Sequence, residues 1–477
     1  MDHYQLTTEL QQTLTTDQAW HYHVVPKSAA DGMLELYIDE KAYQKDVEEE
    51  LEVLLGKKIR FEKMPGELIH KTLSKYYLRN EKSAGQKKTS PVSPEKSGDF
   101  LPALIAEARQ LRSSDIHIEC YEDRCRVRIR IDGLLVERYT LAKAEYPGLI
   151  NKIKIRANLD IAEKRLPQDG RIFFREEGFA FDIRVSVLPT MHGEKIVLRL
   201  LSTDATNIDI RKLGFSEQQL QDYLEGIKRP HGLLLISGPT GSGKTTTLYA
   251  TLKLLNKETT NILTVEDPIE YTLEGINQVQ LKETIGLGFA SALRTFLRQD
   301  PDIIMLGEIR DGETAQMAIR AALTGHLVLS TIHTNSAWAT VSRLTDMGVP
   351  PFLIAGTLNT SVAQRLVRLL CPDCKKREDA DASVYPKTFK APREVSEHFL
   401  ATGCESCFYT GYRGCKAIYE VIPMDAELSE CIRSGSAQVQ TLLRERNIAT
   451  LADNAFSLFE NGETSIDEIY SILCAEH

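Results

Sequence analysis

The feature that most constrains this sequence is a glycine-rich segment, Gly238-Pro-Thr-Gly-Ser-Gly-Lys-Thr245. It fits the pattern G-x-x-x-x-G-K-[S/T] at every position, follows the apolar run GLLLIS and opens the helix-like run TTTLYATLKLL. A strand, a glycine-rich turn and a helix in this order form the context in which the pattern holds nucleotide phosphates. The sequence therefore predicts a P-loop domain of the α/β class.

The residue types of this segment suit the binding of a polyphosphate. Glycines let backbone N–H groups turn inward, and the helix N-terminus adds partial positive charge at the same place. We expect Lys244 to reach the β- and γ-phosphates and the Thr245 hydroxyl to ligate Mg²⁺. ATP is favoured over GTP, because the guanine-reading NKxD motif is absent from the sequence. The predicted nucleotide-binding residues are Gly238, Pro239, Thr240, Gly241, Ser242, Gly243, Lys244, Thr245 and Thr246.

Acidic residues and histidines follow other apolar strands of the same region. In a parallel sheet, ligands bind outside the carboxyl ends of the strands. Glu308 follows DIIMLG, one residue after the place where P-loop proteins usually carry Asp, and we expect it to position Mg²⁺ through water or to polarise the attacking water. Glu266 and Asp267 end ILTVED and are expected to face the nucleotide, or alternatively to cap a helix. His333 lies at the carboxyl end of its strand and His326 at the other end, so His333 is the expected site residue.

Composition and charge bound the remaining possibilities. The chain has 477 residues and a net charge of −9. This length suggests three or four domains, and the charge disfavours nucleic acid as the main partner. No run reaches the ~20 apolar residues that a membrane span needs, and the N-terminus lacks the pattern of a secretory signal. We therefore expect a cytoplasmic protein.

Composition shifts divide the chain into segments. Between the first two domains lies a stretch rich in Lys, Ser, Pro and Gly, which predicts a linker, with an ordered surface loop as the alternative. Strand-like alternation dominates the next segment, and strands alternate with helices in the one after that. The predicted order is an N-terminal α/β domain (1–80), a flexible linker (81–98), an α+β, PAS-like domain (99–205), a RecA-like P-loop domain (206–370), a cysteine-bearing module (371–420) and a helical C-terminal region (421–477).

Four of the nine cysteines form two C-x-x-C pairs, Cys371/Cys374 and Cys404/Cys407. Four thiolates in this arrangement suit a tetrahedral structural Zn²⁺ site. Because such a site has no open coordination position, we assign it a structural role.

The motifs taken together resemble the type II/type IV secretion ATPase superfamily, on its assembly and secretion side. They are SDIHIE (114–119), RIDG (130–133), LPQDGR (166–171), DIRVSVLPT (182–190), GEKIVLRLL (193–201), GPTGSGKTTT (238–247), VEDPIE (265–270), LRQDPDIIMLGEIRD (297–311) and GHLVLSTIHTN (325–335). The resemblance covers almost the whole chain and keeps the family order.

The resemblance implies more than the P-loop alone. VEDPIE is similar to the family's Asp box, DIIMLGEIRD to its atypical Walker B segment and GHLVLSTIHT to its His box. The residues assigned to catalysis are Lys244, Glu308, Glu266, His333, Arg184 and Arg199. Members form homo-hexamers and hold ATP between two domains, with arginines reaching the nucleotide. Cys415 departs from the family, which usually has Arg there. The candidate arginines are Arg184 and Arg199 from the α+β domain, and Arg294, Arg298, Arg310 and Arg343 from the RecA-like domain.

Residues 22–77 resemble the family's N-terminal docking domain, which implies an inner-membrane platform protein as partner and a peripheral association with that membrane. No Arg-Leu-Gly string of the kind linked to cyclic di-GMP is present. The expected function is therefore a hexameric ATPase that powers pseudopilus assembly in type II secretion, with ATP, Mg²⁺ and Zn²⁺ as cofactors. A type IV pilus assembly ATPase is the alternative, and a DNA-handling RecA-like enzyme is a distant one.

Overall fold

The computed structural model of the chain forms two compact units, Met1–Phe100 and Leu101–His477, which are described separately. The predicted linker over 81–98 lies outside the described residues. The structure describes residues 4, 6, 10, 13–14, 16–30, 33–40, 47–48, 51–52, 55, 57–76, 100–176, 179–200, 209–379, 384–386, 389, 391–436 and 438–474.

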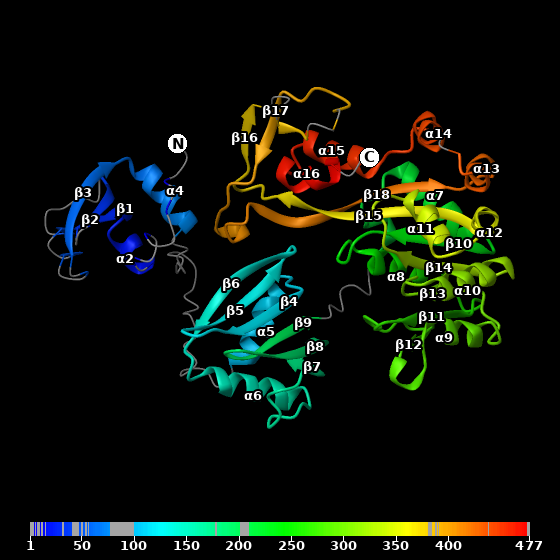
Figure 1. Ribbon diagram of the computed structural model, residues 1–477, viewed down its shortest axis with the longest axis horizontal. Coiled ribbons are helices and arrows are strands. Elements are labelled where there is room, and N and C mark those ends of the chain that lie inside the picture. Colours follow the sequence, from blue (N-terminus) through cyan, green and yellow to red (C-terminus); the bar gives the residue numbers. More distant parts are fainter. Residues whose placement is uncertain are drawn as a thin grey trace. The chain divides into compact units, whose positions relative to one another are not determined.

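The first unit is a small α/β fold, shown in blue in Figure 1. Strand β2 is antiparallel to β1 and parallel to β3. Alternate residues of β2, namely Leu34, Leu36 and Ile38, are fully buried, as expected for a strand with one face on a core. Its elements are α2 (Thr16–His21), β1 (Val24–Ala30), β2 (Met33–Asp39), β3 (Lys58–Met64) and α4 (Gly66–Tyr76).

The second unit begins with an antiparallel six-stranded sheet in the order β6-β5-β4-β9-β8-β7. Strand β5 alternates between buried residues, such as Val127 and Ile129, and half-buried arginines, whereas in β4 the charged Asp115 and Glu119 are buried as well. This is the predicted α+β domain, with one helix before the sheet and one inside it. Its elements are α5 (Phe100–Gln110), β4 (Asp115–Cys120), β5 (Cys125–Ile131), β6 (Leu134–Leu141), α6 (Tyr146–Arg156), β7 (Gln168–Glu176), β8 (Phe179–Thr190) and β9 (Gly193–Leu200).

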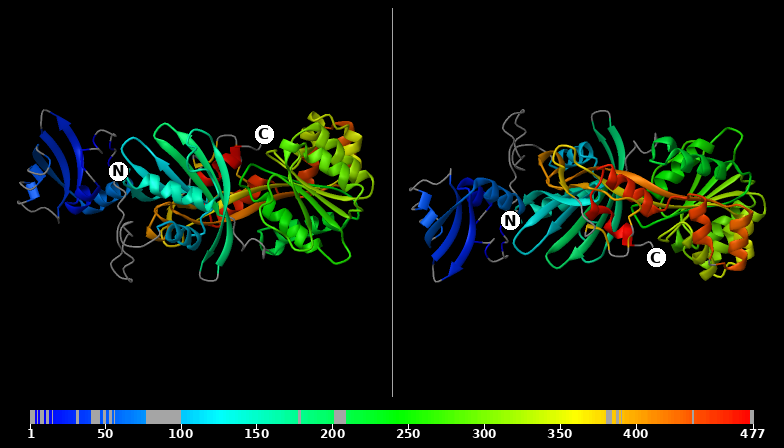
Figure 2. Two further views of the ribbon diagram at one scale, coloured as in Figure 1. Left: turned by 90° about the horizontal axis from the view of Figure 1, so that it is seen from below. Right: turned by 90° about the horizontal axis from the view of Figure 1, so that it is seen from above.

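A second, seven-stranded sheet in the order β12-β11-β13-β14-β10-β15-β18 forms the centre of the α/β core that carries the glycine-rich segment. Leu233 and Leu235 of β10 pack into one hydrophobic cluster, and Leu234 and Ile236 into another. Both faces of the sheet are therefore buried, and Figure 2 shows helices on either side. Its strands are β10 (Gly232–Ser237), β11 (Ile262–Glu266), β12 (Asn277–Gln280), β13 (Ile303–Leu306), β14 (Leu327–Ile332), β15 (Leu358–Leu370) and β18 (Tyr412–Pro423).

Strand β18 was not expected from the sequence. It is antiparallel to β15, whereas every other neighbouring pair of strands in this sheet is parallel. The segment boundary that the sequence suggested at residue 420 therefore falls inside a strand of the α/β core. The helices of this core are α7 (Glu217–Lys228), α8 (Lys244–Leu255), α9 (Phe289–Phe296), α10 (Gly312–Leu323), α11 (Ala339–Asp346) and α12 (Pro351–Thr357).

Between β15 and β18 the chain forms a small two-stranded sheet next to the paired cysteines, and four helices follow β18, as the sequence predicted. Phe456 and Phe459 of the third helix belong to the core cluster that also holds Leu233, so these helices extend the α/β core. No helix in the described part of the chain is long and apolar enough to cross a membrane. The elements are β16 (Lys376–Asp379), β17 (Glu397–Leu400), α13 (Ala426–Ser434), α14 (Val439–Glu445), α15 (Leu451–Glu460) and α16 (Ile466–Cys474).

Candidate nucleotide site

The glycine-rich segment forms the turn between β10 and α8, as predicted. Strand β10 ends at Ser237, and α8 begins at Lys244. Gly243 has φ = 87°, and a methyl group on it would lie 2.8 Å from the side-chain nitrogen of Gln364. Both the backbone angle and the close approach require glycine there. The loop therefore leads directly into the N-terminus of α8, and helix N-termini favour anions.

Lys244 lies folded against its own loop. Its Nζ donates to the carbonyl oxygens of Gly238 at 2.9 Å and Pro239 at 3.0 Å. Burial lowers the pKa of Lys244, nearby Glu308 raises it and nearby Arg365 lowers it. The ammonium therefore lies at the loop with only neutral hydrogen-bond acceptors, which a phosphate group can replace. The Thr245 side chain next to it is exposed, as a Mg²⁺ ligand must be.

Glu308 and His333 are brought together, although 25 residues separate them. Glu308 follows β13 and His333 follows β14, and these two strands are neighbours in the sheet. His333 Nε2 lies 3.1 Å from Glu308 Oε2, Arg310 forms an ion pair with the other oxygen of Glu308, and Arg310 Nη1 lies 3.6 Å from Asp267. Burial raises the pKa of Glu308, but Arg310 and His333 outweigh it and leave the pKa below its usual value. Glu308 is therefore a carboxylate at neutral pH, the form that can polarise water.

Glu266 lies at the end of β11 with its side chain buried. Its carboxylate accepts hydrogen bonds from Tyr249 Oη, from Thr264 Oγ1 at 2.6 Å and from Gln278 Nε2 at 3.1 Å. Asp267, in contrast, points to Arg310. The side chains of Glu266 and Asp267 therefore lie in different environments. Asp267 joins the Glu308 cluster, while the contacts of Glu266 are those of a side chain that holds α8, β11 and β12 together.

The candidate arginines lie in different surroundings. Arg184 of β8 donates to the Ile269 carbonyl and forms an ion pair with Glu270 at 3.1 Å, so it contacts the loop that follows Asp267. Arg199 of β9 pairs with Asp115 at 2.9 Å, and its side chain remains 59% exposed. Arg310 belongs to the Glu308 cluster.

The other candidate arginines have different surroundings. Arg294 pairs with Glu313, Arg298 donates to the Arg294 carbonyl at 2.9 Å, and Arg343 is exposed on α11. His326 lies at the amino end of β14, where its Nδ1 is 2.9 Å from the Ala321 carbonyl. His326 thus belongs to the opposite edge of the sheet, as its position in the sequence indicated.

Two residues on β15 border the phosphate loop and were missed from the sequence. Gln364 is 2% exposed and accepts a hydrogen bond from Thr247 of α8 at 2.9 Å. Arg365 lies beside the first loop residue, because a methyl group on Gly238 would be 3.2 Å from its Nη1. The apolar run RLVRLL at the end of β15 could have indicated a strand, but the polar residues 359–361 near its start do not fit a buried strand pattern.

The four paired cysteines converge as predicted. Their Sγ atoms all lie within 4.8 Å of one another, and three of the separations are 3.8 Å. An ideal tetrahedron with metal–sulfur distances of about 2.3 Å has edges of about 3.8 Å. Backbone N–H groups of Cys404 and Gly411 donate to Cys407 Sγ at 3.2 and 3.3 Å. The four residues therefore fit Zn²⁺, and the fit rests on the sulfur geometry and not on the resemblance.

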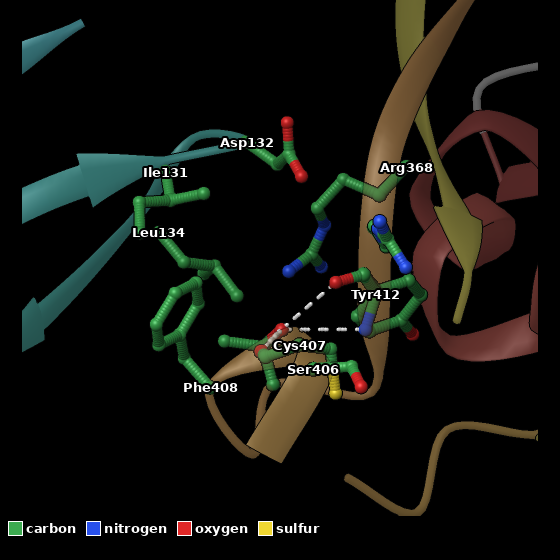
Figure 3. A pocket seen from close by; sticks show the side chains of 10 residues that line it. Ile131, Asp132, Leu134, Arg368, Ser406, Cys407, Phe408 and Tyr412 are labelled. Carbon is green, nitrogen blue, oxygen red and sulfur yellow. Dashed lines mark hydrogen bonds between the residues drawn. The ribbon is translucent and has the colours of Figure 1, made fainter. Parts of the chain in front are cut away.

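A small cavity of about 30 Å³ lies next to this cysteine cluster. Figure 3 shows Leu134, at the start of β6, next to Phe408 on one side of it, Arg368 and Tyr412 on the other, and Asp132 of the β5–β6 turn above them. Arg368 stacks on Tyr412, with its guanidinium carbon 4.2 Å from the ring centroid. The cavity has room for about one or two water molecules and none for a nucleotide, so it is no competitor for the loop at Lys244.

The family described as "Type II/IV secretion system protein" matches residues 94–471. The chain belongs to this family. It is 46% identical over 375 residues to the type II secretion system ATPase E of Vibrio cholerae, covering 78% of this chain and 74% of the relative. It is 40% identical to the type II secretion system protein E of Xanthomonas campestris pv. campestris, covering 94% and 83%.

The chain is also similar to a pilus assembly ATPase and to two solved structures. The type IV pilus assembly ATPase PilB of Myxococcus xanthus is 48% identical, covering 77% of this chain and 66% of the relative. The pilus retraction motor PilT, solved with bound ADP, has a TM-score of 0.54 and 26% identity, covering 78% of this chain and 96% of that one. The Legionella pneumophila ATPase DotB has a TM-score of 0.61 at 24% identity, covering 79% and 96%, and supports the fold. The predicted family and the RecA-like fold are thereby confirmed.

Proposed function

We propose that this chain hydrolyses ATP as a homo-hexamer and powers pseudopilus assembly in type II protein secretion. The observation that carries the proposal is the joint placement of the Lys244 loop and the Glu308–Arg310–His333 cluster at the carboxyl edge of one sheet. Relatives named type II secretion ATPase E support the biological role. PilB supports type IV pilus assembly as the second candidate.

Each residue has a defined task in this mechanism. The loop N–H groups and Lys244 bind the phosphates, and Lys244 exchanges the Gly238 and Pro239 carbonyls for phosphate oxygens. Thr245 would hold Mg²⁺, which neutralises charge on the phosphate oxygens when bound. Glu308, kept ionised by Arg310 and His333, polarises the attacking water.

The loop that follows β11 gives a route from chemistry to motion. Asp267 at its start contacts Arg310, and Glu270, three residues later, pairs with Arg184 of the α+β domain. The Glu270 N–H also donates to Tyr249 Oη on α8 at 3.3 Å. A change at Glu308 that shifts Arg310 would therefore move a loop held by the α+β domain. Rigid-body motion of packed domains is a common outcome of such coupling.

The partner proposal rests on the first unit and on the family. We propose that this unit docks on an inner-membrane platform protein and that the motor is thereby held at that membrane. Zn²⁺ at the four cysteines would keep the C-terminal region folded and take no part in hydrolysis.

A deletion strain of the source organism tests the biological role. We expect type II substrates to accumulate inside the envelope while surface pili are retained, and wild-type protein but not Glu308→Gln to restore secretion. Cell fractionation and electron microscopy of pili give the two readouts. Loss of pili with normal secretion would contradict the type II assignment and favour the pilus alternative.

A further inference from the structure

The geometry points to a second cation at the phosphate loop, and we propose that Arg365 binds the nucleotide phosphates together with Lys244 of the same chain. This inference rests on the proposed ATP site and names a further residue of it. Arg365 is absent from the arginines that the sequence assigned to the site, all of which lie on other elements.

The position of Arg365 follows from strand order. β15 is the parallel neighbour of β10, and their register pairs Ser237 with Ala363. Two residues further along β15, Arg365 therefore stands beside the start of the phosphate loop. Its guanidinium reaches across the end of β10, because its Nη2 donates to the carbonyl oxygen of Asn335, after β14, at 3.2 Å. The side chain thus crosses the edge of the sheet at which the phosphates bind.

The hydrogen-bond partners of Arg365 leave its charge available. Its acceptors among the described residues are the Gln364 carbonyl and the Asn335 carbonyl and amide oxygens, all of them uncharged. Glu420 acts on Arg365 through space, but no ion pair of Arg365 occurs in the part of the chain that the structure describes. A guanidinium has five N–H donors and cannot lose its proton at neutral pH. A half-buried cation of this kind favours a bidentate anion such as phosphate.

A second polar group converges on the same point. A methyl group on Gly238 would lie 2.7 Å from Ser242 Oγ and 3.2 Å from Arg365 Nη1. The Ser242 side chain is 3% exposed, and its hydroxyl has no hydrogen-bond partner among the described residues. Buried polar groups of native proteins are nearly always paired. The unpaired hydroxyl, the guanidinium and Lys244 therefore surround the first residue of the loop, which is the arrangement of a site built for an anion.

The test compares Arg365→Gln and Arg365→Lys with wild type in the full-length protein. The probe is ATP with Mg²⁺, its Kd measured at several salt concentrations, together with the melting temperature of nucleotide-free protein. We expect Arg365→Gln to weaken ATP binding roughly tenfold, with a shallower salt dependence and an unchanged melting temperature. Arg365→Lys, which keeps the charge, should recover part of the affinity and the wild-type salt dependence. Arg320→Gln, on the exposed face of α10, is the matched control and should bind ATP as wild type does.

Two results would overturn the role of Arg365. One is wild-type ATP affinity in Arg365→Gln. The other is an equal loss of affinity in the Gln and Lys variants with the salt dependence of wild type, which would assign Arg365 to holding Asn335 only. If wild-type protein itself fails to bind ATP, the proposed function fails, and this outcome is distinct from both.

Discussion

Glu308→Gln should lower kcat for ATP hydrolysis by about 10²- to 10⁴-fold, the usual contribution of a positioned general base. The substitution removes the charge that draws the proton from water and keeps the size of the side chain. Because Lys244 and the loop N–H groups are untouched, the Kd for ATP should remain close to that of wild type. Steady-state hydrolysis and equilibrium nucleotide binding on the same preparation measure the two quantities.

Glu225→Gln is the matched control for this experiment, since Glu225 is an exposed glutamate on α7 with the same change in charge. It should hydrolyse ATP at the wild-type rate. A Glu308→Gln protein with normal kcat would remove Glu308 from the chemistry and leave its cluster with Arg310 and His333 as a structural feature.

Removal of Zn²⁺ should unfold the region between β15 and β18 and loosen the C-terminal helices. Binding to four thiolates contributes on the order of 10 kcal/mol to folding in small zinc domains, far more than this region gains from its two short strands. The effect should spread, because Lys375 Nζ donates to the Gly462 carbonyl at 2.8 Å and Leu370 N–H to the Glu463 carbonyl at 2.8 Å. Hydrogen exchange after chelation should rise in β16, β17, α15 and α16 and stay unchanged in β11 and β13.

Cys404→Ser should reproduce the chelated state without chelator, whereas Cys474→Ser, at an exposed cysteine outside the cluster, should exchange as wild type does. Zinc content by atomic emission links each exchange pattern to occupancy. A metal-free protein with the wild-type exchange pattern would show that the cysteines need no metal to hold this fold.

The phosphate loop could be predicted in full because its chemistry is local. Lys244 and Thr245 follow the glycines at fixed spacing, and the apolar runs on either side define strand and helix. The placement of Glu308 and His333 at the site could also be predicted from the sequence, since both residues follow apolar strands whose carboxyl ends meet at one edge of the sheet. Their roles in catalysis remain predictions that the experiments above decide.

Strand β15 was hidden because its buried residues are polar. Asn359, Thr360 and Ser361 interrupt the apolar pattern, yet each is at most 7% exposed. Neighbours supply partners for two of them: Asn359 Nδ2 donates to the His231 carbonyl at 2.8 Å, and Ser361 Oγ lies 2.8 Å from Thr340 Oγ1. Hydropathy cannot reveal such a strand, because the compensating groups are remote in sequence. Gln364 and Arg365 were missed together with it.

The hydrogen-bond partners of Glu266 could not be predicted from the sequence either. Its position at a strand end suggested a residue facing the nucleotide. In the structure its carboxylate accepts hydrogen bonds from Tyr249, Thr264 and Gln278, from α8, β11 and β12, and its role in catalysis stays a prediction. Only the packing of α8 against the sheet brings Tyr249 to this carboxylate, and no local pattern encodes that contact.

Equilibrium binding of ATP to Lys244→Ala, with Mg²⁺ present, tests the central claim most directly. Loss of a cation that bonds phosphate oxygens should weaken binding roughly 10- to 100-fold and abolish hydrolysis, while the melting temperature of nucleotide-free protein stays near that of wild type. Unchanged ATP affinity in Lys244→Ala would place the nucleotide elsewhere and contradict the account.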